Sequence, residues 1–177
     1  ADVIQRTPQG VDVIPATWNL ATATSSKGSA RRLQRALEPI KEDYPLIVID
    51  VPATAGELQY NALQAATGLV IPLEADTYNI QSLYQTIDAA EAMKKSNPAL
   101  KIRGVVFTKY DDRANLTKQI RQTIEQTAAQ MGVASLGIIR AGIAVKEAAA
   151  FQQSLFEYAP KSKPAQDYLT VYDALMI

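Results

Sequence analysis

Short apolar runs alternate along this chain with longer stretches in which apolar residues recur every three or four positions. Short unbroken runs rich in β-branched residues are typical of strands in a parallel sheet that is covered on both faces. The sequence therefore predicts strands at about 11–14, 46–51, 69–73, 102–108 and 134–139.

The stretches between these runs have the spacing of amphipathic helices. The clearest one ends at Gly132, which suits the end of a helix, and its apolar stripe consists of Leu116, Ile120, Ile124, Ala128 and Met131. Other helices are predicted at about 16–26, from about 29, and at 57–66, 79–96, 144–152 and 163–176. Strands that alternate with helices indicate right-handed βαβ crossovers. We therefore expect residues 1–177 to form a single α/β domain with a mostly parallel sheet and flanking helices.

The composition narrows the chemistry that such a domain can perform. The chain has no cysteine and no histidine, which excludes thiolate nucleophiles, imidazole bases, structural zinc and iron–sulfur clusters within it. Its 18 basic and 18 acidic residues balance, so any contact with nucleic acid must come from a local patch of positive charge. No apolar run approaches the roughly 20 residues of a membrane span, and we expect a cytoplasmic protein without a membrane partner.

The predicted strand at 46–51 carries an acid, Asp50, near its end and runs into a loop that contains Pro52 and Gly56. Loops at the carboxyl ends of parallel strands are where open α/β sheets bind ligands. Asp50 is therefore a candidate carboxylate of a reaction site. The alternative is an acid that caps the loop after a strand.

Nine segments match one known family in their order and spacing. They are DVIPA at 12–16, YPLIVIDVP at 44–52, NALQAA at 61–66, VIPL at 70–73, GVVFTKYDDR at 104–113, IIR at 138–140, KEA at 146–148, YAPKS at 158–162 and AQDYL at 165–169. Together they resemble the ParA/Soj partition ATPases of the deviant Walker-type P-loop superfamily. The resemblance covers essentially the whole chain.

The resemblance implies a P-loop NTPase-like fold that is incomplete on its N-terminal side. Nothing in the chain resembles the family's phosphate-binding loop. Such a loop needs glycines that free backbone N–H groups for the phosphates, and a lysine for the outer ones. We therefore interpret the chain as the C-terminal portion of such an ATPase, and we do not expect it to hydrolyse ATP alone.

The resemblance also assigns residues to ATP and Mg²⁺. It implies that Asp50 is the catalytic switch acid, which holds Mg²⁺ directly or through water, or orients the attacking water. Pro52 and Gly56 belong to the loop that faces the γ-phosphate. One acceptor at a strand end suffices for this role, because phosphoryl transfer depends mainly on charge stabilisation and positioning.

Three residues around the end of the predicted strand at 102–108 lie where the family contacts the nucleotide base: Thr108, Lys109 and Asp111. A side-chain acceptor in such a loop suits the exocyclic amine of a purine. An ordinary turn between a strand and a helix explains the same residues equally well.

Arg113 is the strongest candidate for a DNA contact, because the resemblance places it in the loop before the family's DNA-facing helix. The supporting cations are Lys118, Arg121, Arg140 and Lys146. Arg and Lys contacts to phosphates give affinity without sequence readout and a steep loss of binding with salt. The alternative for the supporting residues is a solvated helix face.

The resemblance implies an ATPase that partitions plasmid, chromosomal or mobile-element DNA. It further implies an ATP-dependent homodimer, nonspecific DNA binding at the nucleoid and a ParB-like centromere-binding partner. A MinD-like membrane ATPase fits less well, because the C-terminal stretch has little positive charge opposite its apolar side. The rival interpretations are a non-enzymatic DNA-binding or protein-interaction module and a truncated structural remnant.

Overall fold

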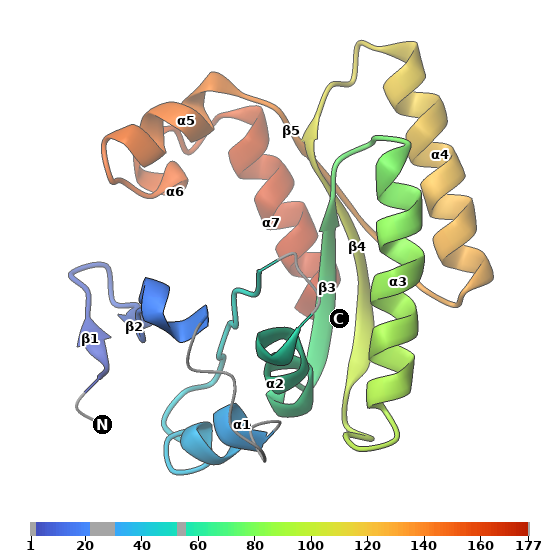
Figure 1. Cartoon of the computed structure of the whole chain (residues 1–177). Helices are drawn as coiled ribbons and strands as arrows, with labels where there is room; N and C mark the ends of the chain where they lie inside the picture. Colours follow the sequence, from blue (N-terminus) through green and yellow to red (C-terminus); the bar gives the residue numbers. More distant parts are fainter. Residues whose placement is uncertain (1–2, 22–30, 53–55, 177) are drawn as a thin grey trace. The chain divides into compact units, whose positions relative to one another are not determined.

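The computed structural model describes residues 3–21, 31–52 and 56–176 (Figure 1). Contacts between residues divide the chain into two compact units, 1–65 and 66–177, which are described in turn. The single α/β domain that the sequence predicts over the whole chain therefore stays a prediction.

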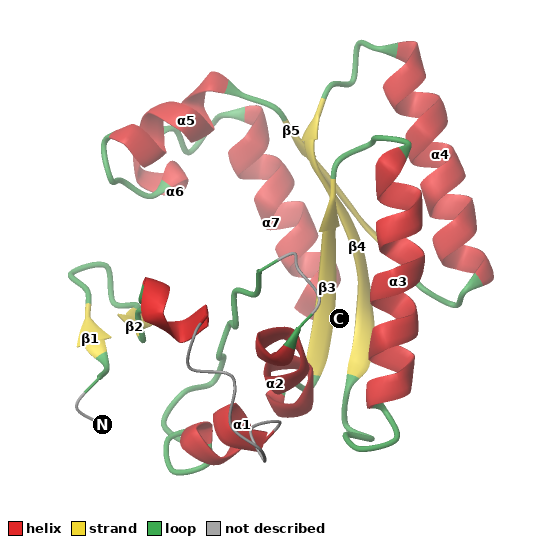
Figure 2. Ribbon diagram, in the orientation of Figure 1, coloured by secondary structure: helices red, strands yellow, loops and turns green. Residues whose placement is uncertain are grey.

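The larger unit contains a three-stranded parallel sheet (Figure 2). Its strands β3 (Gly68–Leu73), β4 (Lys101–Tyr110) and β5 (Ser135–Arg140) lie in this order. Two helices, α3 (Tyr78–Met93) and α4 (Asn115–Gln130), return the chain from the end of one strand to the start of the next. This is the βαβ arrangement that the alternating pattern predicts, and the α/β fold class is confirmed.

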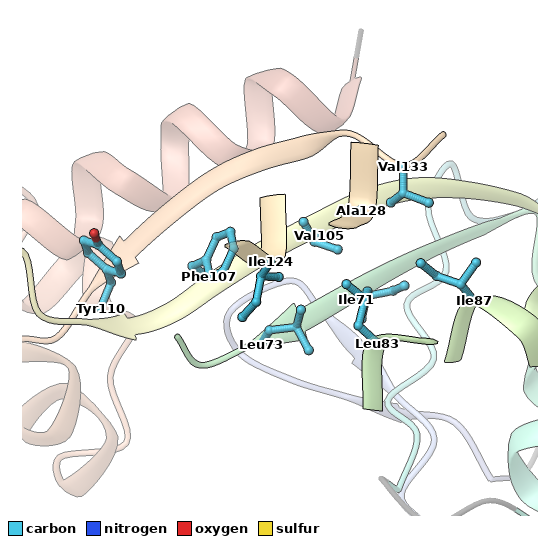
Figure 3. Close-up of a cluster of buried hydrophobic side chains, with 10 residues drawn as sticks. All are labelled: Ile71, Leu73, Leu83, Ile87, Val105, Phe107, Tyr110, Ile124, Ala128 and Val133. Carbon is cyan, nitrogen blue, oxygen red and sulfur yellow. The ribbon is translucent and has the colours of Figure 1, made fainter. Parts of the chain in front are cut away.

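Helices cover both faces of this sheet (Figure 1). The helix α7 (Lys163–Met176) packs on one face, in a cluster of Val106, Leu136, Ile139 and Val171. On the opposite face, α3 and α4 cover the main core (Figure 3), which consists of Ile71, Leu73, Leu83, Ile87, Val105, Phe107, Tyr110, Ile124, Ala128 and Val133. Each large apolar side chain buried in this way contributes roughly 1.5–3 kcal/mol. The two clusters therefore fix the sheet and the loops at its carboxyl edge.

Two short helices, α5 (Ile143–Ala150) and α6 (Leu155–Tyr158), connect β5 to α7 and pack against each other. The ring of Phe151 stacks on that of Tyr158, with centroids 5.7 Å apart. The Tyr158 hydroxyl donates to a carboxylate oxygen of Glu147 at 3.2 Å. These contacts hold the α5–α6 turn together.

The predicted helices of the larger unit agree with the structure to within a few residues. The stripe that ends at Gly132 is α4, and Gly132 has a φ of 73°, the left-handed conformation typical of a helix end. Across the described ranges, no helix has both the length and the apolar character needed to cross a membrane.

The smaller unit contains short elements only. Its strands β1 (Gln5–Arg6) and β2 (Asp12–Val13) form an antiparallel hairpin, and a 3-10 turn, η1 (Trp18–Ala21), follows. Two helices, α1 (Arg32–Leu37) and α2 (Glu57–Ala65), pack against each other. The strand predicted at 11–14 is thus reduced to two residues.

Asn61, in the segment NALQAA, joins the two helices of the smaller unit. Its Oδ1 accepts hydrogen bonds from the backbone N–H groups of Arg32 and Leu33, at 3.1 and 3.4 Å. Its Nδ2 donates to the carbonyl of Glu57 at 3.0 Å. The first N–H groups of a helix have no partner within that helix, so α2 supplies the cap of α1 through Asn61.

The strand predicted at 46–51 was wrong. Leu46, Ile47 and Val48 are 61%, 38% and 80% exposed, and the segment pairs with no strand among the described residues. An apolar run forms a strand only where a neighbouring strand takes up its N–H and C=O groups, and the described part of the chain provides no such neighbour. The helix predicted at 16–26 is only the turn η1 as far as residue 21, and 22–30 lie outside the described residues.

Candidate functional site

The carboxyl ends of β4 and β5 bring charged residues together. Tyr110, the last residue of β4, is in register with Arg140, the last residue of β5. A pocket of about 260 Å³ lies at this edge and is lined by Tyr110, Asp111, Asp112, Arg113, Arg140, Ala141 and Lys163. Three residues that the sequence selects, Asp111, Arg113 and Arg140, therefore meet where α/β sheets bind ligands.

Arg113 is paired with the acid two positions before it. Its backbone N–H and its Nε both donate to Oδ1 of Asp111, at 3.0 and 3.3 Å. The hydrogen bonds from the Arg113 backbone and side chain hold the pKa of Asp111 below its ordinary value. The two side chains are 89% and 49% exposed, so solvent screens the pair and it adds little stability. The pair with Asp111 therefore holds the Arg113 side chain only weakly.

Thr108 and Lys109 connect the ends of β3 and β4. The Thr108 hydroxyl donates to the carbonyl of Leu73 at 3.4 Å, and the Lys109 ammonium lies 2.6 Å from Oε1 of Glu74. Lys109 has a φ of 50°, which turns the backbone near the end of the strand. Neither residue lines the pocket that Asp111 lines, and the assignment of all three to a nucleotide base stays a prediction.

Arg140 forms a two-point ion pair with Asp167 of α7. Its Nε lies 2.8 Å from Oδ2 and its Nη2 lies 2.6 Å from Oδ1, while its backbone N–H donates to Oδ2 at 3.0 Å. The side chains are 26% and 11% exposed. Burial alone would raise the pKa of Asp167, but the hydrogen bonds and the charge of Arg140 outweigh it and lower that pKa. Such bidentate pairs have fixed geometry, so Asp167 holds the guanidinium at the pocket and ties α7 to β5.

The other three cations selected from the sequence lie outside the pocket lining. The guanidinium carbon of Arg121 lies 5.6 Å from the ring centroid of Tyr110, and its Nε lies 3.1 Å from Oε1 of Glu125. Lys118 and Lys146 are exposed, and neither forms an ion pair with another described residue. Contacts with Tyr110 and Glu125 therefore hold the side chain of Arg121, whereas the two lysines face solvent.

Asp50, Pro52 and Gly56 belong to the smaller unit. Asp50 and Pro52 are exposed, Gly56 is partly buried, and 53–55 lie outside the described residues. In the described part of the chain, no three His, Cys, Asp or Glu side chains are grouped to hold a metal ion. Mg²⁺ is usually bound by one or two carboxylates together with water and substrate phosphates. The single carboxylate of Asp50 fits that kind of site.

Two residues at this edge, Lys163 and Asp167, were not among the site residues predicted from the sequence. Asp167 is buried on the same side of α7 as Val171, one turn away. An acid on the buried face of a helix indicates a cation as its partner, and this signal was available in the sequence. No comparable signal marks Lys163, because lysines near helix ends are usually solvated.

The parallel sheet with helices on both faces defines an α/β domain, and its likeness to solved structures shows a P-loop ATPase-like fold. Cobyrinic acid a,c-diamide synthase from Mycobacterium smegmatis, solved with bound ADP and magnesium, has a TM-score of 0.81 and 26% identity, over 99% of this chain and 65% of that one. Apo McdA from Cyanothece has a TM-score of 0.82 and 24% identity, over 98% of this chain and 72% of that one. The fold predicted from the resemblance is confirmed.

The family follows from the sequence comparisons. The family model described as "AAA domain" matches residues 1–102. The sporulation initiation inhibitor protein Soj of Bacillus subtilis is 33% identical over 174 residues, which are 95% of this chain and 68% of Soj. The chromosome partitioning protein ParA of Myxococcus xanthus is 30% identical over 171 residues, which are 94% of this chain and 60% of that protein. The chain belongs to the ParA/Soj-like family of P-loop ATPases, and it spans between 60% and 68% of the length of these two relatives.

Proposed function

We propose that this chain acts in a ParA-type partition ATPase and binds DNA without sequence preference at the carboxyl edge of its sheet. The observation that carries the proposal is that Arg113, in the loop after β4, and Arg140, the last residue of β5, line one pocket. Guanidinium groups bind phosphates, and such contacts supply most of the affinity for DNA of any sequence. The exposed Lys118 and Lys146, together with Arg121, are further candidate contacts to DNA phosphates.

ATP and Mg²⁺ belong to the same proposal. Solved relatives contain ADP or an ATP analogue with magnesium. When bound, Mg²⁺ would neutralise charge on the transferred phosphate. Asp50 would accept a hydrogen bond from a water molecule, Pro52 and Gly56 would face the γ-phosphate, and the base would be contacted by Thr108, Lys109 and Asp111. The chain has no glycine-rich phosphate loop, so we expect it not to hydrolyse ATP by itself.

The proposed partners come from family membership. We expect a homodimer that forms with ATP, a ParB-like centromere-binding protein that stimulates hydrolysis, and a cytoplasmic location at the nucleoid. The naming of relatives as chromosome partitioning proteins supports this assignment.

A second candidate function is a DNA-binding or protein-interaction module without enzyme activity, and the cations of the pocket suit it equally well. Titration of the full-length natural protein with ATP, with and without Mg²⁺, separates the two. We expect binding that depends on Mg²⁺, because Asp50 would hold the ion, directly or through water, and the ion would offset the charge of the phosphates. A full-length protein that binds no ATP would exclude the ATPase.

Arg113→Ala tests the DNA interface. We expect binding to a random-sequence duplex at about 0.1 M salt to weaken roughly three- to tenfold, and the slope of log affinity against log salt to fall by about 1. Gel shifts across a salt series measure both. Arg103→Ala is the matched control, because Arg103 is an exposed arginine near the opposite end of β4. If Arg113→Ala binds like the wild type, Arg113 makes no DNA contact.

A further inference from the structure

The pocket at the carboxyl edge contains a third cation, Lys163, which no sequence motif indicates. Arg113 is paired with Asp111, and Arg140 is paired with Asp167. Lys163 is exposed and forms no ion pair with another described residue. Among the three cations it is the one outside an ion pair with a described residue, although its charge also helps to lower the pKa of Asp167.

The place of Lys163 in α7 is unfavourable for the helix. It is the first residue of α7, where the helix dipole is positive and a cation is disfavoured. The helix start is already capped, because Oγ of Ser162 accepts from the backbone N–H of Ala165 at 3.4 Å. The attraction between Lys163 and Asp167, one turn further along α7, offsets part of this cost, and an anionic ligand in the pocket would favour the lysine further.

The acidic groups around the pocket limit which anion it can take. Asp111 and Asp112 line it. The pKa of Arg140 is raised mainly by the hydrogen bonds that its side chain donates to Asp167, and the charge of Asp112 adds a smaller effect in the same direction. The three cations are thus opposed by these two carboxylates and by Asp167. A phosphodiester carries a single negative charge. It therefore suits this near balance of positive and negative groups better than a highly charged triphosphate does.

The size of the pocket supports the same ligand. Pockets that enclose a whole small molecule have volumes of about 300–1,000 Å³, and this one has about 260 Å³. It is large enough for one phosphate group of a strand that lies across the edge. We propose that Lys163, with Arg113, binds a backbone phosphate of DNA here, and that Asp112 opposes this binding. The proposal rests on the DNA binding proposed above and names its phosphate site.

Lys163→Ala tests this site in the purified chain with a random-sequence duplex as the probe. We expect affinity at about 0.1 M salt to fall roughly two- to fivefold, equally for AT-rich and GC-rich duplexes, and the salt slope to fall by about 1. Lys161→Ala is the matched control. Lys161 is an exposed lysine two positions earlier that does not line the pocket, and we expect its removal to leave the slope unchanged.

Two further variants keep the test specific. Lys163→Arg retains the charge and should restore the wild-type slope, whereas Asp112→Asn should raise affinity about two- to fivefold by removing an opposing charge. The thermal midpoint of Lys163→Ala should change little, because relief of the unfavourable cation at the helix N-terminus offsets the lost attraction to Asp167. Equal affinity and slope for wild type and Lys163→Ala would overturn the phosphate site alone. A wild type that binds no DNA would overturn both this site and the proposed function.

Discussion

Asp167→Ala is expected to lower the free energy of unfolding by about 3 kcal/mol. The substitution removes the carboxylate that accepts three hydrogen bonds from Arg140, and it leaves a guanidinium that is only 26% exposed without a partner. Breaking a buried pair from one side costs roughly 3–5 kcal/mol, and the partial exposure of Arg140 favours the lower end. Urea unfolding followed by circular dichroism measures the change.

Asp173→Ala is the matched control for this prediction. Asp173 is an exposed acid on the same helix, so its removal should change stability by no more than about 0.5 kcal/mol. Asp167→Asn keeps one oxygen acceptor and should lie between the control and Asp167→Ala. A wild-type urea midpoint for Asp167→Ala would contradict the role of the pair in holding α7 to β5.

The same pair predicts how stability responds to acid. The pKa of Asp167 is lower in the folded protein than its ordinary value of 3.8. Its stabilisation is therefore fully present above the unfolded pKa and is lost as the pH falls below about 4, through the folded pKa. Unfolding free energies of wild type and Asp167→Asn should differ at pH 7 and converge in acid. If the two curves of unfolding free energy against pH stay parallel down to about pH 2, the pair is not the source of the acid sensitivity.

Helix α4 shows what the sequence could predict. Its apolar stripe indicates which face of the helix is buried and how long the helix is, and the glycine after the stripe marks its C-terminal end. All three features depend on residues that are close together in the sequence. The parallel sheet followed in the same way from alternating strand and helix patterns. Features that depend on neighbours in the sequence were therefore predicted well.

The segment at 46–51 shows what a local apolar pattern could not predict. An apolar run indicates that residues prefer burial, but not which element covers or pairs with them. The described residues offer it no strand partner, so it stays irregular and exposed. The same limit applies to the candidate site. The pairing of Asp111 with Arg113 is local in the sequence and could be predicted, whereas the pairing of Arg140 with Asp167 depends on how α7 packs on β5.

Gly104→Ala is expected to cost about 2–4 kcal/mol of folding free energy. Gly104 has a φ of 152°, a conformation that side chains other than glycine rarely adopt. A Cβ there would lie 2.7 Å from the carbonyl oxygen of Ala134 and 2.7 Å from Cγ of Leu136. The Ala134 carbonyl also accepts from the N–H of Val105 at 2.9 Å, so it cannot withdraw without breaking the β4–β5 pairing.

Gly68→Ala is the control for this substitution. Gly68 is exposed at the start of the neighbouring strand β3, and its added Cβ would meet only the flexible side chain of Arg103, at 3.2 Å. We expect a change of less than about 1 kcal/mol there, and equal urea midpoints for the two variants would contradict the prediction. The substitution at Gly104 should also disturb the proposed DNA site, because Tyr110 and Arg140 are in register at the far end of the same strand pair. A folded Gly104→Ala protein should therefore bind DNA more weakly than Gly68→Ala, although neither glycine lines the pocket.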